Sequence, residues 1–189
     1  MTRTWFVTGT DTGVGKTAVS CALLAAAARA GLRTAAIKPV AAGCDASGRN
    51  EDALLLLQWM TEPLAYEQVN PVALSAAIAP HIAAQQEGRL LQASRLAGLC
   101  RGVMLAGADF VLIEGAGGWR VPISARETLA DVGRQAVPPL GVGHDHVVDH
   151  AVVGLGDGLL HLVELLRVDV RPGVLLAVDH AGLQRLVDL

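Results

Sequence analysis

The sequence predicts an α/β fold, in which a parallel sheet carries helices on both of its faces. Short runs that are apolar at every position alternate with longer segments of helical spacing, as in sheets that are buried on both sides. A glycine-rich segment joins the first apolar run to the first helical segment. Hydrophobic residues make up 52% of the chain but aromatic residues only 3%, which suits Ala-rich helices packed closely on a sheet.

The first elements follow one another closely. Trp5-Phe6-Val7 is a short apolar run and is expected to form a buried strand. The segment from Ala18 to Ala30 is rich in Ala and Leu and has strong helix propensity, and Gly31 follows where helices commonly end. Thr34 to Lys38 is then expected to form a second short strand, which Pro39 ends.

Further elements continue the alternation. Asn50 is expected to cap a helix that runs from Glu51 to about Met60. Ser94 to Ala106 has apolar residues at helical spacing, and Phe110-Val111-Leu112-Ile113 is a compact apolar run expected to form a strand. Val174 to Val178 is expected to form a late strand. These elements predict a parallel sheet covered on two sides.

The segment Thr8 to Thr17, TGTDTGVGKT, links the first strand to the first helix and has the pattern of a phosphate-binding loop. Glycines allow backbone N–H groups to converge on phosphate oxygens, and the helix N-terminus adds partial positive charge. Lys16 is expected to reach the β- and γ-phosphates, and the Thr17 hydroxyl to ligate Mg²⁺. Gly9 lies one residue further from Gly15 than usual, so the loop is a variant. The alternative is an ordinary glycine turn, but the strand–loop–helix context favours a P-loop NTPase-like fold that binds a nucleotide.

Length and composition limit the other possibilities. The 189 residues predict a single domain over residues 1–189. No apolar run approaches the roughly 20 residues that span a bilayer, so no membrane segment is expected. The three cysteines are odd in number and far apart, which is typical of free thiols in the cytoplasm. A net charge of −3 argues against nucleic acid as the main partner.

Three polar residues lie at or near predicted strand ends and helix starts. Ligands of an open parallel sheet bind beyond the carboxyl ends of its strands, so Lys38, Glu114 and the phosphate loop are expected to face one crevice. Glu114 has the placement of a carboxylate associated with Mg²⁺, and the alternative is a solvated side chain. Asp52 is either a further ligand or an acid favoured by the helix dipole. Lys38 is either a cation for phosphate or an ordinary surface lysine.

Several segments in this order carry a resemblance to a known family. They are Thr8 to Thr17, Lys38 to Gly43, Asn50 to Leu54, Asn70-Pro71, Pro80-His81-Ile82, Gln86 to Arg89 and Glu114 to Trp119. Together they resemble the dethiobiotin synthetases, ATP-dependent cyclo-ligases of biotin biosynthesis. Amidotransferase-type cobyrinate synthetases share the loop, but the Pro-His-Ile and Gln-Glu-Gly segments favour the dethiobiotin synthetases. The resemblance covers roughly residues 1–135.

The resemblance implies a set of site residues. Lys38 corresponds to the catalytic lysine of the family. The residues that would contact ATP are Gly13, Val14, Gly15, Lys16, Thr17, Asp52, Glu114, Gly115, Ala116 and Gly117. Those that would hold Mg²⁺ are Thr17, Asp52 and Glu114, and those that would contact the substrate are Thr12, Lys38 and Ala42.

The resemblance also implies the reaction and the partners. One amine of 7,8-diaminononanoate captures CO₂ or bicarbonate-derived CO₂ as a carbamate, and ATP phosphorylates the carbamate. The second amine then closes a cyclic urea, with release of ADP and phosphate. Family members form a dimer, so a homodimer is expected. Gly13 replaces a glutamate and Ala42 a serine found in many relatives, and each change removes one polar contact.

Residues 136–189 form a divergent tail. Asp149 stands where the family is expected to have an asparagine, and Gly154, Gly156 and Gly158 interrupt an expected helix. The alternative function is therefore a nucleotide-binding protein or scaffold of the same fold that has lost substrate capture. The tail also contains a cluster of possible metal ligands, formed by His144, His146, Asp149 and His150. It suggests either a metal site or a polar loop that binds nothing.

Overall fold

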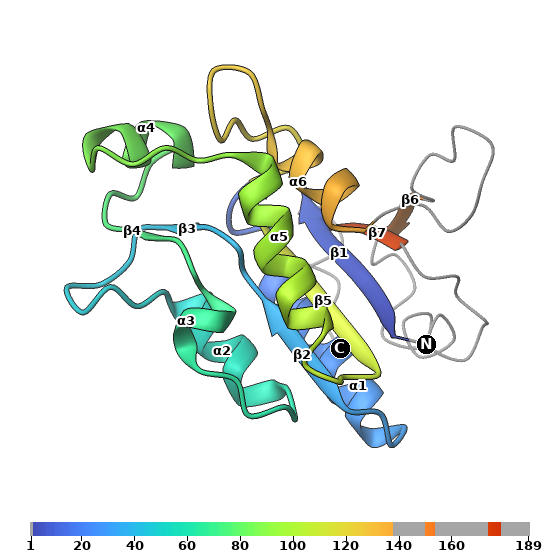
Figure 1. Ribbon diagram of the computed structural model, residues 1–189. Coiled ribbons are helices and arrows are strands. Elements are labelled where there is room, and N and C mark those ends of the chain that lie inside the picture. Colours follow the sequence, from blue (N-terminus) through green and yellow to red (C-terminus); the bar gives the residue numbers. More distant parts are fainter. Residues whose placement is uncertain (1, 138–149, 154–173, 179–189) are drawn as a thin grey trace.

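A five-stranded parallel sheet forms the centre of the protein (Figure 1). The structure, a computed structural model, describes residues 2–137, 150–153 and 174–178. The strands lie in the order β2-β5-β1-β7-β6. They are β1 (Arg3–Gly9), β2 (Thr34–Ile37), β5 (Phe110–Gly118), β6 (His150–Val153) and β7 (Val174–Val178). Each neighbouring pair in this sheet is parallel, as the sequence predicts.

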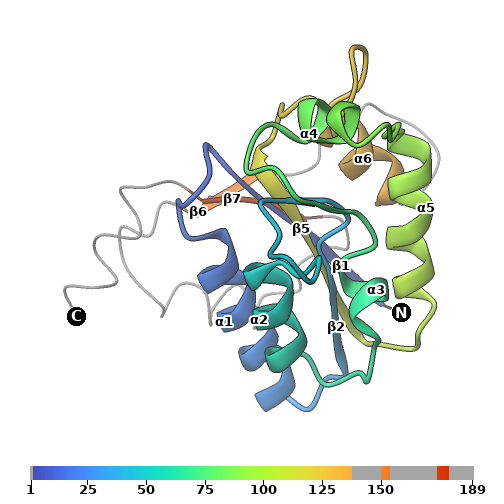
Figure 2. The same ribbon diagram turned by 90° about the vertical axis from the view of Figure 1, so that its left-hand side faces the viewer.

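Helices cover both faces of the sheet, with α1 and α2 on one side and α5 and α6 on the other (Figure 2). The helices are α1 (Lys16–Arg29), α2 (Glu51–Trp59), α3 (Tyr66–Val69), α4 (Pro80–Gln86), α5 (Ala93–Met104) and α6 (Leu129–Ala136). A separate pair of two-residue strands, β3 (Ala41–Ala42) and β4 (Ala73–Leu74), pairs in parallel next to α4. The predicted fold class is confirmed.

Alternation along the strands divides the core into two apolar clusters. Successive side chains of a strand point to opposite faces. Trp5 and Val7 of β1 therefore pack with α1 and α2, whereas Phe6 between them packs with α5 and α6. All three are at most 2% exposed. Burial on both faces explains why the strands are apolar at every position rather than at alternate ones.

The same alternation determines which face the predicted site residues occupy. In β5, Leu112 belongs to the cluster on the α1 side and Ile113 to the opposite cluster. Glu114, one step further along the strand, therefore returns to the α1 side. In β2, Ala36 lies on the α1 side, so Lys38 directly after the strand is directed to that side as well. The two charged residues meet because they share a face and a sheet edge.

Strand β5 is longer than predicted, because it continues beyond Ile113 through Glu114 to Gly118. Its pairing with β1 extends from Arg3↔Phe110 to Gly9↔Gly118, with an irregularity between Val7 and Gly9. A Cβ on Gly118 would lie only 3.0 Å from the carbonyl oxygen of Thr10. Glycine therefore allows the strand to remain close to the phosphate loop.

Other boundaries fall near their predicted places. Helix α1 begins at Lys16 rather than Ala18, and Gly31 follows it with a φ of +81°, as expected of a residue that ends a helix. Asn50 caps α2, since its side-chain oxygen accepts the Ala53 N–H at 3.3 Å. The late strand at residues 174–178 is confirmed.

No periodic pattern predicts the short elements β3, β4, β6, α3 and α4, or the helix α6. Helix α6 has a signal that pattern reading missed. The Asp131 carboxylate accepts hydrogen bonds from the Thr128 N–H at 2.8 Å and from its hydroxyl at 2.9 Å. A Thr followed three residues later by an acidic residue is typical of a helix start. The interpretations of His144, His146, Asp149 and the three glycines lie outside the described residues.

The three cysteines are unpaired, as the sequence predicts. In the part of the chain that the structure describes, no helix is both long and apolar enough to cross a membrane.

We predict that Leu24→Ala lowers the free energy of unfolding by about 2–5 kcal/mol, because it leaves a cavity against the sheet. Leu24 lies in α1 and is fully buried. Urea unfolding measures the change. The control is Leu105→Ala, at a leucine that is 86% exposed, and it should change stability by no more than about 0.5 kcal/mol. Equal effects of the two substitutions would contradict the packing described here.

Candidate active site

The loop between β1 and α1 has the backbone of an anion-binding turn. Gly13 and Gly15 have φ values of +75° and +96°, which residues other than glycine rarely adopt. Gly15 is the N-cap of α1 and offers no side chain to the first-turn N–H groups. These N–H groups and the positive end of the helix dipole remain directed at the loop. The loop can therefore accept phosphate oxygens.

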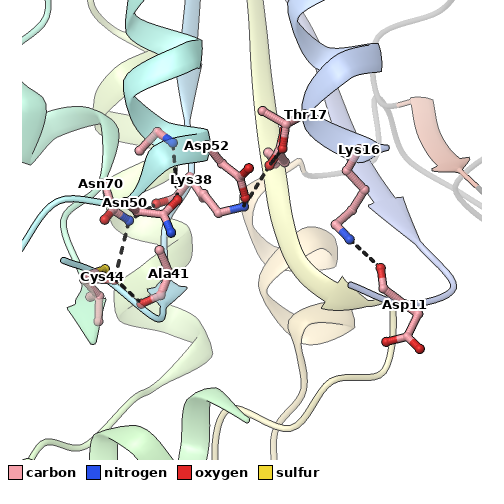
Figure 3. Close-up of polar contacts among 12 residues, drawn as sticks. Asp11, Lys16, Thr17, Lys38, Ala41, Cys44, Asn50, Asp52 and Asn70 are labelled. Carbon is pink, nitrogen blue, oxygen red and sulfur yellow. Dashed lines mark hydrogen bonds and ion pairs between the residues drawn. The ribbon is translucent and has the colours of Figure 1, made fainter. Parts of the chain in front are cut away.

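Lys16 is buried at the start of α1 and turns back over the loop. Its Nζ donates a hydrogen bond of 2.6 Å to the carbonyl oxygen of Asp11 (Figure 3). Burial lowers the pKa of Lys16, and the nearby positive charge of Lys38 lowers it further. Both effects favour an anionic ligand at this position, because a phosphate would compensate the desolvated charge.

Lys38 is the centre of the site and is almost completely buried, with 4% of its surface exposed. Its Nζ lies 2.7 Å from Oε1 of Glu114 and 2.9 Å from Oδ2 of Asp52. The Thr17 hydroxyl donates to the same Oε1 at 2.9 Å. Figure 3 shows Asp52 from α2 and Thr17 from α1 converging on the lysine. Elements far apart in the sequence thus place a cation, two carboxylates and a hydroxyl together.

The charges of this cluster stabilise one another. Burial by itself would lower the pKa of Lys38, but the negative charges of Glu114 and Asp52 outweigh it and raise the pKa above its ordinary value. Burial would raise the pKa of Asp52, but the ammonium of Lys38 outweighs it and lowers the pKa. Lys38 is therefore a cation and Asp52 an anion at neutral pH.

These positions exclude the alternative interpretations of Glu114 and Lys38. Glu114 is fully buried and is not a solvated residue at a strand end. Lys38 is not a surface lysine. Asp52 does lie in the first turn of α2, where an acid favours the helix dipole, but it also pairs with Lys38.

The donor set fits Mg²⁺. Oε2 of Glu114 is buried and has no hydrogen-bond partner among the described residues, so one carboxylate oxygen can bind a cation. Asp52 and Thr17 contribute further oxygen atoms close by. In the described ranges, no three His, Cys, Asp or Glu side chains gather into a metal cluster. Such a sparse set of protein oxygens suits Mg²⁺, which usually retains water and phosphate ligands.

The remaining predicted residues do not join the hydrogen bonds of this cluster in the part of the chain described. Thr12 lies exposed in the phosphate loop, and Ala42 is half-buried in β3. Gly115, Ala116 and Gly117 continue β5 beyond Glu114. A Cβ on Gly117 would lie 2.9 Å from the Val121 side chain, so this position too requires a glycine.

Sequence reasoning missed two polar residues behind the site, although a signal for one of them was present. Asn70 was included only as part of a segment typical of the family, and Tyr66 was not considered. Asn70 is 3% exposed and donates from Nδ2 to the carbonyl oxygen of Lys38 at 2.8 Å. The sequence also contains a further signal for the site as a whole: Lys16 and Lys38 are the only two lysines in the chain, and both lie there.

The sequence of this chain matches a family model and several known proteins. A family model described as an AAA domain matches residues 3–136. The ATP-dependent dethiobiotin synthetase of Marinobacter nauticus is 52% identical over 171 residues, which covers 84% of this chain and 72% of that protein. The chain belongs to the dethiobiotin synthetase family. It is accordingly an enzyme of the ligase class that depends on ATP.

Two further ATP-dependent dethiobiotin synthetases are similar to this chain. The protein of Cellvibrio japonicus is 60% identical over 133 residues, which covers 69% of this chain and 58% of that protein. The protein of Pseudomonas paraeruginosa is 52% identical over 165 residues, which covers 82% of this chain and 72% of that protein. The chain thus matches between 58% and 72% of the length of these three relatives. The alignment with the Marinobacter nauticus protein covers 84% of this chain, which is more than residues 1–135 alone would make up. The aligned region therefore extends into the tail.

We predict that Lys38→Met lowers the free energy of unfolding by about 3–5 kcal/mol, because it leaves the buried Glu114 carboxylate without a cation. The double variant Lys38→Met/Glu114→Gln removes both charges and should regain most of this loss. Urea unfolding at neutral pH measures both variants. If the double variant is as unstable as the single one, the charge of Glu114 is not compensated chiefly by Lys38.

Proposed function

We propose that this chain is an ATP- and Mg²⁺-dependent cyclo-ligase that carboxylates 7,8-diaminononanoate with CO₂ and forms dethiobiotin, ADP and phosphate. The supporting observation is the cluster around Lys38. A buried ammonium held by two carboxylates, next to the hydroxyl of a phosphate loop, is suited to stabilising phosphoryl transfer. The names of the relatives support dethiobiotin as the product and ATP as the energy source.

The chain's residues would first bind and orient the phosphates. The N–H groups of the loop and the Lys16 ammonium would contact the phosphate oxygens of ATP. Mg²⁺, when bound to Thr17, Asp52 and Glu114, would neutralise charge on the β- and γ-phosphates. Lys38 would lie on the substrate side of this cluster, because it follows β2 next to β3, where Ala42 is located.

The reaction needs no covalent intermediate on the protein. One substrate amine adds to CO₂ and loses a proton, which gives a carbamate. A carbamate oxygen attacks the γ-phosphorus, and the bond to the ADP oxygen breaks. The second amine attacks the carbonyl carbon of the mixed anhydride and loses a proton, phosphate leaves with the electron pair of its C–O bond and takes up that proton, and a cyclic urea remains.

Lys38 is the catalytic residue in this proposal. Negative charge spreads over the transferred phosphoryl group, and a preorganised cation stabilises it without reorganisation. The raised pKa of Lys38 keeps its side chain protonated for this role. Homodimer formation and a cytoplasmic location remain predictions.

The decisive experiment is turnover of ATP to ADP with bicarbonate, in the presence and in the absence of 7,8-diaminononanoate. We expect turnover only with the diamine, and a cyclic urea product detected by mass spectrometry. Tight ATP binding without turnover would overturn the proposed reaction and would favour the nucleotide-binding alternative.

We also predict that Lys16→Ala weakens ATP binding by about 10- to 150-fold, since a charged hydrogen bond contributes roughly 1.5–3 kcal/mol. Calorimetry measures the dissociation constant. The matched control is Arg29→Ala, which removes an exposed cation at the far end of the same helix and should leave the affinity unchanged. ATP affinity within about twofold of the parent in Lys16→Ala would refute the phosphate role of the loop.

A further inference from the structure

We propose that Tyr66 and Asn70 are positioning residues, which fix the main chain of Lys38 relative to the helix start that carries Asp52. The proposal rests on the proposed function, because it concerns the two residues assigned above to phosphoryl transfer and metal binding. Tyr66 and Asn70 do not enter the ion pairs of Lys38, and both act through the backbone.

Asn70 holds the backbone of Lys38 directly. Its Nδ2 donates to the carbonyl oxygen of Lys38 at 2.8 Å, and more distantly to that of Val72 at 3.5 Å. The Lys38 N–H donates to the carbonyl oxygen of Val69 at 2.7 Å. Both backbone polar groups of Lys38 are therefore held by the segment at residues 69–70. Figure 3 shows Asn70 beside Lys38, on the side away from Lys16.

Tyr66 joins Asn70 to the start of α2. The Tyr66 hydroxyl accepts the Asn50 N–H at 2.7 Å and donates to Oδ1 of Asn70 at 3.1 Å. Asn50 in turn caps α2 through the Ala53 N–H, and Asp52 lies in the first turn of this helix. Burial raises the pKa of Tyr66, so its hydroxyl remains a donor.

These contacts form a closed ring. It runs from Asn50 through Tyr66 and Asn70 to the backbone of Lys38, and the 2.9 Å ion pair between Lys38 and Asp52 returns it to α2. The side chain at position 70 must accept a hydrogen bond at one atom and donate one at another, which an amide does and a carboxylate does not. The residue types at 66 and 70 are thus explained by the ring.

The ring matters for function because Lys38 has a long side chain whose ammonium must meet two carboxylates at once. The Nζ distances of 2.7 Å and 2.9 Å leave little tolerance for a shift of the main chain. A displacement of about 1 Å at a catalytic group can reduce the rate on the order of 100-fold. Fixing the strand end and the helix start together protects this geometry.

The first test compares Asn70→Asp with Tyr66→Phe. Asn70→Asp keeps the shape but removes the donor to Lys38, and kcat should fall about 10- to 100-fold while the KM for ATP stays within about twofold. Tyr66→Phe removes only the hydroxyl and keeps the aromatic ring, whose centroid lies 5.1 Å from Cζ of Arg49. Tyr66→Phe should also reduce kcat, by a smaller factor than Asn70→Asp does. Asn70→Gln should likewise have a lower kcat than the parent.

A matched control separates positioning from general stability. Thr61 accepts the Thr34 N–H at 2.8 Å, at the opposite end of β2 from Lys38. Thr61→Val removes this hydrogen bond without changing the shape of the side chain. It should lower the melting temperature and leave kcat unchanged. A parent-like kcat in Asn70→Asp would overturn the proposal, as would an equal fall of kcat in Thr61→Val.

A second readout does not depend on turnover. Because the chain contains two lysines, protein labelled with ¹⁵N-lysine gives two ammonium signals by NMR, and Lys16→Ala identifies the one from Lys38. Asn70→Asp and Tyr66→Phe should shift this signal and accelerate its hydrogen exchange, whereas Thr61→Val should not. If the parent shows no turnover but the Lys38 signal responds in this way, the proposed function fails and the positioning role stands. An unchanged Lys38 signal in Asn70→Asp overturns the positioning role, even in an active enzyme.

Discussion

The ion pair between Lys38 and Glu114 is the interaction on which the rest of the site depends. Two opposite charges lie 2.7 Å apart in a position from which water is almost excluded. An unpaired charge at such a depth is strongly destabilising, so each residue requires the other. The pair also ties the end of β2 to the middle of β5, and Thr17 of α1 binds to the same carboxylate. The phosphate loop and the strand ends therefore form one charged unit.

The arrangement of the sheet explains how these charges come together at little structural cost. Parallel strands end at one edge, and alternation directs Lys38 and Glu114 to the face covered by α1 and α2. Helix α2 then brings Asp52 over the lysine. Lys38 and Glu114 each occupy a buried position that would otherwise be apolar. Hydrogen bonds and ion pairs within the cluster satisfy nearly all of its polar atoms. The exception is Oε2 of Glu114, which is the atom available to a cation.

A second layer of neutral polar contacts supports the charged one. Tyr66 and Asn70 bind backbone groups and do not enter the ion pairs. Neutral hydrogen bonds suit this task because they are directional and do not alter the charge balance around Lys38. The site thus separates the groups that carry charge from the groups that fix their position, which is common where geometry within a fraction of an ångström is needed.

The fold class, the phosphate loop and the residues at the strand ends can be predicted from the sequence, because local rules govern them. Apolar runs predict buried strands, and glycines with a following Gly-Lys-Thr predict the loop. The continuation of β5 to Gly118 could not be predicted in this way, because it depends on pairing with β1. The partners of Lys38 and its hydrogen bond with Asn70 likewise come from the tertiary structure, since they join residues 14 to 76 positions apart in the chain. Long-range contacts of this kind leave no periodic pattern in the sequence, because strand order and helix placement determine them rather than neighbouring residues.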